Sequence, residues 1–167
     1  MILTVFRHGE AADAASDYAR RLTAWGEEDV ARAGHALASA CQARKIAPPD
    51  VLCCSPWIRT MATADILSLT LPAALAEVVA ALQPGAKVRD VEAMLEERQA
   101  AGAPAAHMLL VSHQPLVSRL INHWLDEDGR VPSLSPGAFA SLEMDSLARG
   151  CGHLLFWASP PTCEPVA

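Results

Sequence analysis

Features that many protein classes need are missing from this chain of 167 residues. No apolar stretch approaches the roughly 20 residues that a membrane-spanning helix requires. The short apolar run at the N-terminus has no charged region ahead of it, unlike a secretion signal. Basic residues form no run, and 13 Lys and Arg against 19 Asp and Glu give a net charge of −6. We therefore expect a cytoplasmic protein that binds neither nucleic acid nor a membrane.

Cysteine pairing is also not evident. The five cysteines are an odd number, with no Cys-x-x-Cys and no nearby His at metal-binding spacing. We interpret them as reduced thiols that pack as small apolar side chains, rather than as a disulfide or a zinc site.

The chain contains enough hydrophobic residues to form one core. Hydrophobic residues make up 51% of the sequence and charged residues 19%. There is no internal repeat and no sign of a second domain. We expect a single domain over residues 1–160, followed by a Pro-rich tail at 161–167.

Short apolar runs alternate with segments of helical periodicity. The expected strands span residues 2–6, 50–55, 75–79, 107–112, 138–144 and 153–157. The expected helices span residues 23–45, 55–69, 87–101 and 115–125, with Thr23 and Ser55 as N-caps. This alternation predicts an α/β fold with a mostly parallel central sheet and helices on both faces. The last two strands are expected at a sheet edge.

The first strand ends in Arg7, His8 and Gly9. Gly9 lacks a Cβ, so the backbone there is able to turn sharply and approach a ligand. In open α/β sheets, ligands bind outside the carboxyl ends of the strands. The sequence thus presents a cation and an imidazole where a ligand is expected.

Two other predicted strands are also followed by a cationic or imidazole side chain. Arg59 follows the second strand, although a surface salt bridge would explain it equally well. His113 follows the strand at 107–112. Together with Arg7 and His8, these side chains predict a phosphate pocket at one sheet edge. Ser16, together with an arginine of the same segment (Arg20 or Arg21), is a further candidate by proximity, with a solvated loop as the competing interpretation.

These motifs, in this order, resemble the histidine phosphatase superfamily. Arg7-His8-Gly9 stands as its signature, residues 55–59 (SPWIR) resemble Ser-Pro-x-x-Arg, and Ser112-His113 resembles its second histidine. Residues 7–11 (RHGEA), 17–26 (DYARRLTAWG) and 112–117 (SHQPLV) are similar to the short SixA-type phosphohistidine phosphatases.

The resemblance implies roles for these residues. His8 would attack phosphorus and carry the phosphoryl group covalently. It must be neutral, with a backbone carbonyl on its other ring nitrogen. Arg7 and Arg59 would clamp the phosphoryl oxygens, and His113, if protonated, would donate to them. Gln114, at the start of the next helix, is a further phosphate-binding candidate. No metal and no cofactor is implied.

One departure concerns the general acid. Many members of the family carry a glutamate after the third strand, often as Glu-Leu-x-Pro, where this chain has Ala81-Leu82-Gln83-Pro84. Glu77 and Glu10 are the remaining candidates. Without an acid, the alcohol of an alkyl phosphate would have to leave as an alkoxide, which is a poor leaving group. An imidazole, which titrates near ~6.5, carries its own proton when it leaves.

No connection between elements exceeds about a dozen residues, so we expect no lid insertion. An open site suits a protein-borne substrate. We therefore expect a phosphohistidine phosphatase that acts on a partner protein, such as a histidine-containing phosphotransfer domain in signal transduction, and releases inorganic phosphate. One alternative is a small-molecule phosphomonoesterase that uses Glu77 or Glu10 as acid. The other is a non-catalytic phosphate-binding module, which the presence of His8 with both arginines disfavours.

Overall fold

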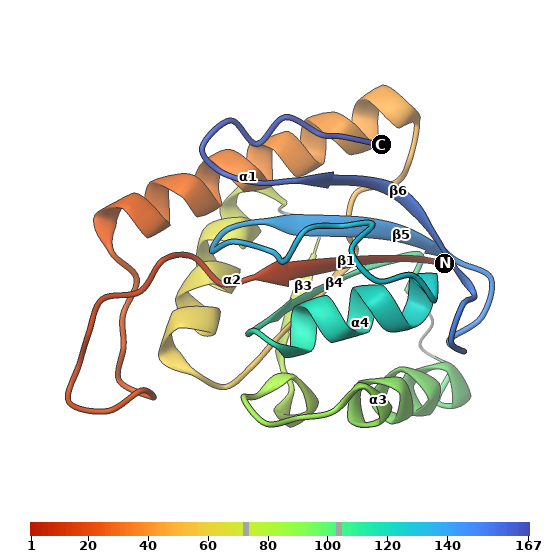
Figure 1. The fold of residues 1–167 in the computed structure, drawn as a ribbon, viewed down its shortest axis with the longest axis horizontal. Helices are drawn as coiled ribbons and strands as arrows, with labels where there is room; N and C mark the ends of the chain where they lie inside the picture. Colours follow the sequence, from red (N-terminus) through yellow and green to blue (C-terminus); the bar gives the residue numbers. More distant parts are fainter. Residues whose placement is uncertain (72–73, 103–104) are drawn as a thin grey trace.

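The computed structural model describes residues 1–71, 74–102 and 105–167. A six-stranded sheet forms its centre, in the order β3-β2-β4-β1-β5-β6 (Figure 1). Its strands are β1 (Ile2–Arg7), β2 (Val51–Cys54), β3 (Leu75–Val78), β4 (His107–Ser112), β5 (Phe139–Met144) and β6 (Gly152–Ala158). β3, β2, β4 and β1 pair in parallel, whereas β5 runs antiparallel to β1 and β6 antiparallel to β5. The prediction of a mostly parallel sheet is confirmed.

Helices cover both faces of the sheet, as predicted. They are α1 (Ala24–Arg44), α2 (Ile58–Thr70), α3 (Val88–Ala100) and α4 (Leu116–Leu125), with a short 3-10 turn η1 (Ala80–Leu82) after β3. α1 and α2 pack on one face, and α3 and α4 on the other (Figure 1). Within β1, Leu3 and Val5 join one core cluster and Phe6 the other, because successive side chains of a strand point to opposite faces.

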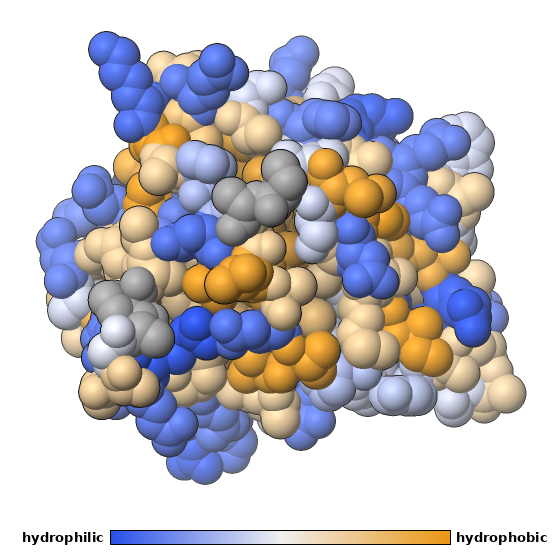
Figure 2. All heavy atoms as spheres, turned by 180° about the vertical axis from the view of Figure 1, so that it is seen from behind, coloured by the Kyte–Doolittle hydropathy of each residue, from blue (hydrophilic) through white to orange (hydrophobic). Residues whose placement is uncertain are grey.

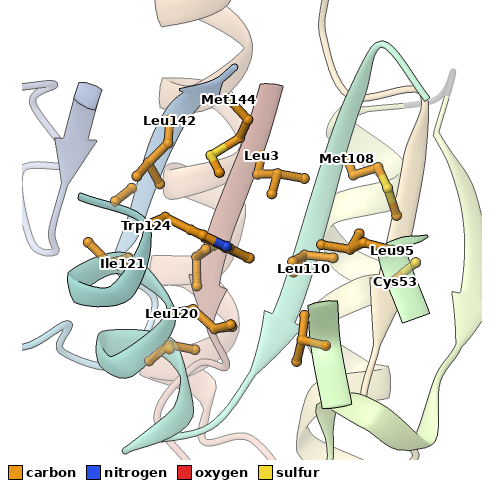
Figure 3. Close-up of a cluster of buried hydrophobic side chains, with 14 of the residues drawn as sticks. Leu3, Cys53, Leu95, Met108, Leu110, Leu120, Ile121, Trp124, Leu142 and Met144 are labelled. Atoms are coloured by element: carbon orange, nitrogen blue, oxygen red, sulfur yellow. The ribbon is translucent and has the colours of Figure 1, made fainter. Parts of the chain in front are cut away.

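The cluster under α3 and α4 is shown in Figure 3. Trp124 of α4 is fully buried and lies against β1, near Leu3, Leu142 and Met144. Burying side chains of this size stabilises the fold by roughly 1.5–3 kcal/mol each. The cluster therefore anchors β1, whose carboxyl end carries Arg7.

The starts of two helices differ in how they are capped. Thr23 caps α1 as predicted, because its Oγ1 accepts from the Gly26 amide at 3.0 Å. The prediction that Ser55 and Pro56 begin α2 is wrong: the helix starts at Ile58, with Trp57 as its N-cap residue. Ser55 is fully buried, and its hydroxyl lies against His113 instead of capping the helix.

The cysteines are free, and four of them are buried. Burial raises the pKa of the Cys53 thiol to about 12 and those of Cys41 and Cys54 to about 11. These groups therefore stay as thiols at neutral pH and lack the reactivity of a thiolate.

No helix in the described part of the chain is long and apolar enough to cross a membrane. Figure 2 shows the molecule from behind, with several strongly hydrophobic patches interspersed with hydrophilic side chains. Exposed apolar residues include Leu75 and Val78 of the edge strand β3.

Candidate active site

The register of the sheet brings three strand ends together. Arg7 at the end of β1 pairs with Ser112 at the end of β4, and Cys54 of β2 pairs with Val111. The pairing continues one residue further, since the His8 amide donates to the Ser112 carbonyl at 3.1 Å. Residues that follow β1, β2 and β4 therefore share one edge of the sheet.

A cavity of about 290 Å³ opens at this edge. It is lined by Arg7, His8, Glu10, Ala11, Asp17, Arg20, Arg59, His113, Gln114 and Pro136. The structure thus brings together the two arginines and two histidines that the sequence singled out, with Glu10 and Gln114 beside them. Ser16 and Glu77 do not line the cavity.

His8 is buried and held in one orientation. Its Nδ1 lies 2.7 Å from the Gly9 carbonyl, which can only accept, so Nδ1 donates and Nε2 keeps its lone pair. Burial, together with the charges of Arg59 and Arg7, lowers the pKa of His8 to about 4. The imidazole is therefore neutral near pH 7, and its Nε2 is unprotonated, which is the form required for attack.

Gly9 has a packing role that the sequence did not indicate. A Cβ on Gly9 would lie 2.7 Å from Val30 Cγ2 and 2.8 Å from the Gly26 carbonyl oxygen, both in α1. Its amide donates to Thr63 Oγ1 of α2 at 3.2 Å. The missing Cβ therefore permits close packing against α1, and the approach of a ligand at Gly9 stays a prediction.

Arg59 is only 4% exposed, which rules out the surface position considered from sequence. Its Nε donates to His8 Nε2 at 3.1 Å. Its Nη1 donates to the Asp17 carbonyl at 2.6 Å, and Nη2 donates to Asp17 Oδ2 at 3.2 Å. The guanidinium also lies over the Trp57 ring, 4.7 Å from its centroid. Asp17 thus takes hydrogen bonds that a phosphoryl group in this cavity would also need.

Arg7 is held by the segment between α4 and β5. Its Nη1 donates to the Leu134 carbonyl at 2.8 Å. The Gly137 amide, from the same segment, lies within hydrogen-bonding distance of the carbonyls of Arg7 and His8. Arg7 Nε is buried and has no partner among the described residues. The segment before β5 therefore orients Arg7 through Nη1, while the buried Nε stays unpaired.

His113 faces the same cavity, and its ring centroid lies 5.1 Å from that of His8. Its Nε2 lies 2.9 Å from Ser55 Oγ. Burial, together with the neighbouring His8 and Arg59, lowers the pKa of His113 to about 3. These surroundings keep the ring neutral near pH 7, so the protonated form in which His113 was predicted to donate is disfavoured.

Arg20 is the arginine of the segment after Gly9 that lines the cavity. Its Nε and Nη2 donate to the carbonyls of Ala12 and Ala11, and its Nη1 lies 3.4 Å from Asp17 Oδ1. Its position in the 17–26 stretch, which resembled the family, was the available signal. The neighbouring Ser16 is exposed, and its carbonyl accepts from the Ala19 amide. Asp17 and Arg20, rather than Ser16, face the cavity from this segment.

The fold that carries this site has a counterpart among solved structures. The structure of the protein histidine phosphatase SixA in complex with tungstate is 30% identical to this chain. The match covers 96% of this chain and 97% of that one, with a TM-score of 0.77. This chain belongs to the histidine phosphatase superfamily, in its SixA type.

Two other structures assigned as SixA phosphohistidine phosphatases share the fold of this superfamily. That from Nakamurella multipartitia is 24% identical, over 99% of this chain and 96% of that one, with a TM-score of 0.72. That from Agrobacterium tumefaciens is 19% identical, over 95% and 97%, with a TM-score of 0.76. No model of a protein family matches the sequence, and no curated protein does.

This chain departs from the pattern of its superfamily at the position of the general acid, where it has Ala81 instead of a glutamate. Ala81 lies in η1, where the neighbouring Leu82 carbonyl accepts from Ser112 Oγ at 2.7 Å. The structure does not bring Glu77 to the cavity, because both of its carboxylate oxygens accept from the guanidinium of Arg98. Glu10 does line the cavity, and its Oε1 accepts from Thr23 Oγ1 at 3.0 Å.

Gln114 also lines the cavity, but its amide nitrogen is engaged elsewhere. It donates to Ser118 Oγ at 2.8 Å and, at 3.1 Å, to Ser133 Oγ and the Leu134 carbonyl. Gln114 thereby ties the start of α4 to the segment that holds Arg7.

Proposed function

We propose that this protein removes the phosphoryl group from a phosphohistidine carried by a partner protein, through a covalent phosphohistidine on His8. Membership of the histidine phosphatase superfamily supports a phosphatase, and the 30% identical SixA is named as a protein histidine phosphatase. The observation that carries the proposal is the state of His8. It is a neutral imidazole with Nδ1 held by a carbonyl and Nε2 in a cavity lined by arginines.

The reaction proceeds in two displacements. Nε2 of His8 attacks phosphorus, and the P–N bond to the substrate imidazole breaks as that ring leaves neutral. His8 then carries the phosphoryl group on Nε2 and a proton on Nδ1, so its ring is positive and is stabilised by the Gly9 carbonyl. Water next attacks phosphorus, the bond to Nε2 breaks, and inorganic phosphate leaves with His8 neutral again.

The position of the carboxylates favours a phosphoramidate substrate. Ala81 cannot donate a proton, and Glu77 is paired with Arg98. An alkyl phosphate needs such a donor, whereas a phosphohistidine ring carries its own proton before the bond breaks. A histidine-containing phosphotransfer domain of a signalling relay is the kind of partner protein that presents this group.

A small-molecule phosphomonoesterase is the second candidate, and one observation favours it. Glu10 lines the cavity and is exposed, so it is placed to meet a leaving group. If Glu10 is the acid, alkyl phosphates will be hydrolysed as well as phosphoramidates.

The test compares leaving groups. Wild-type protein, Glu10→Gln and Ala81→Glu are assayed on a phosphorylated phosphotransfer domain, phosphoramidate, an aryl phosphate and an alkyl phosphate. We expect the phosphoramidates and the aryl phosphate to turn over and the alkyl phosphate to be nearly inert. Ala81→Glu should raise alkyl phosphate turnover selectively, toward the roughly 10²-fold that a positioned general acid contributes. Glu77→Gln is the matched control, since Glu77 is outside the cavity.

Efficient alkyl phosphate turnover that is lost in Glu10→Gln would favour the phosphomonoesterase. The covalent step is tested by quenching enzyme and labelled substrate in alkali and locating the label, which we expect on His8. Binding of phosphate without turnover of any substrate would leave only the binding module.

A further inference from the structure

Ser55 is a fully buried serine whose backbone is fixed on both sides. Its amide donates to the Val111 carbonyl at 3.2 Å, and its carbonyl accepts from Thr60 Oγ1 at 2.9 Å. Its Oγ therefore has little freedom and lies 2.9 Å from His113 Nε2. A second contact is longer, with the Trp57 amide donating toward the same oxygen at 3.4 Å.

These contacts distinguish the two neutral tautomers of His113. Within the described residues, His113 Nε2 is the one partner that is able to accept the Ser55 hydroxyl proton, because the Trp57 amide only donates. If Nε2 carried the ring proton, the buried hydroxyl would have no acceptor, and Nδ1 would be a buried, unpaired acceptor. If Nδ1 carries the proton, only the Nδ1–H is unpaired. Buried polar groups are rarely left unsatisfied, so the second arrangement is favoured.

Nδ1 is the ring nitrogen left for a ligand. It is buried and has no hydrogen-bond partner among the described residues, while the ring lines the cavity beside His8. A phosphoryl oxygen only accepts hydrogen bonds. A neutral ring serves such an oxygen only when its free nitrogen is the protonated one.

We propose that Ser55 is a positioning residue that holds His113 in its Nδ1–H tautomer, so that the neutral ring donates a hydrogen bond to a phosphoryl oxygen. The role in catalysis rests on the proposed phosphatase function, but the tautomer itself does not. Ser55 thus helps to create a donor without adding charge to a site already lined by Arg7, Arg20 and Arg59. Burial keeps His113 neutral, which is why the tautomer decides whether it donates.

The tautomer is measured directly by NMR correlation of the histidine ring nitrogens and carbon-bound protons in ¹⁵N-labelled protein at pH 7. His113→Gln assigns the His113 signals by their loss. In the wild type we expect a protonated Nδ1 and an unprotonated Nε2 on His113, with the Nδ1 signal shifting when inorganic phosphate is added. A protonated Nε2 in the wild type would overturn the proposal, whatever the protein hydrolyses.

Variants extend the test to function. Ser55→Ala should move the His113 proton partly or wholly to Nε2 and lower kcat by roughly 10-fold or more, since losing a preorganised donor altogether reduces rates by about 10²–10³. Ser55→Thr keeps the hydroxyl and should restore the tautomer and most of the rate. Ser141→Ala is the matched control, because Ser141 is equally buried but bonds to Thr4 within the sheet.

An unchanged His113 tautomer and an unchanged kcat in Ser55→Ala would contradict the proposal. Should Nδ1–H be found while phosphohistidine proteins are not hydrolysed, the positioning role stands and the proposed function fails.

Discussion

At the scale of one residue, the Arg59 side chain is held in place by its neighbours before any substrate binds. Its Nε contacts the nucleophilic nitrogen of His8, and its other two nitrogens contact Asp17. The Trp57 ring lies against the guanidinium plane. These contacts hold the planar guanidinium in one orientation, and a phosphoryl group would have to compete with Asp17 for its paired donors.

Replacing Arg59 with Lys should therefore reduce turnover strongly although the charge is kept. The ammonium group cannot supply two parallel donors, and each charge-assisted hydrogen bond is worth about 1.5–3 kcal/mol. We expect kcat/KM to fall by roughly 10²-fold or more. Arg32→Lys, at a surface arginine paired with Asp29, is the control for the substitution itself. Near-normal rates in Arg59→Lys would mean that Arg59 supplies only charge.

At the scale of elements, two segments with no regular structure complete the site. Residues 11–22 bring Asp17 and Arg20 to the cavity, and the segment before β5 fixes Arg7 through the Leu134 carbonyl. The carboxylate of Asp17 lies against Arg59 and Arg20, and both arginines lower its pKa. Asp17 therefore stays ionised and competes with any anion for these cations.

Asp17→Asn should tighten the binding of inorganic phosphate. The amide removes the competing charge, while the Asp17 backbone carbonyl that holds Arg59 Nη1 is retained. Because the carboxylate is half exposed, we expect a gain of no more than about 5-fold at low salt, in line with the ~1 kcal/mol limit of exposed ion pairs. Calorimetric titration measures it, with Asp13→Asn as the control for a charge change on the same exposed segment. Weaker binding in Asp17→Asn would show that the carboxylate aligns Arg59 instead.

The contact between α1 and the nucleophile segment gives a second test at this scale. A Cβ on Gly26 would lie 2.2 Å from the Glu10 carbonyl oxygen, so Gly26→Ala must displace the backbone that follows Gly9. We expect a loss of stability of about 1–3 kcal/mol in chemical unfolding, and a lower kcat. Gly34→Ala, on the same helix, meets the Thr70 side chain rather than backbone. It should destabilise the protein but spare kcat, and an equal loss of kcat in both variants would contradict this account.

For the whole molecule, buried histidines tie stability to pH. Burial lowers the pKa of His8 to about 4 and of His113 to about 3, and it also lowers that of His107. In the unfolded chain these groups titrate near ~6.5. Between these limits the unfolded chain binds more protons than the folded protein, so acid favours unfolding.

We therefore expect the free energy of unfolding to be highest above pH ~6.5 and to fall as the pH decreases toward 4. Each histidine contributes at most about 1.4 kcal/mol per pH unit, and coupling between His8 and His113 reduces their sum. Asp50, whose pKa is lowered by its hydrogen bonds with the Ala106 and His107 amides, adds to the loss only below pH ~3.8. Urea unfolding from pH 7 to 4 measures the slope. His113→Gln should flatten it and His153→Gln, at an exposed residue, should not; a flat wild-type profile would refute the linkage.

The sequence by itself determined the architecture and the principal residues of the site. Alternating apolar runs and helical periodicity sufficed for the α/β sheet, because burial of apolar side chains depends on local pattern. Arg7, His8, Arg59 and His113 were found because each follows a predicted strand, and the carboxyl ends of parallel strands meet at one edge.

Only the tertiary structure decided which other side chains join them. Asp17 rather than Ser16 reaches Arg59, Glu77 turns to Arg98, and Ser55 faces His113 instead of capping α2. Each outcome depends on a partner distant in sequence, whose position is set by how helices and loops pack on the sheet. No local pattern carries that information, so these contacts appear only once the chain is folded.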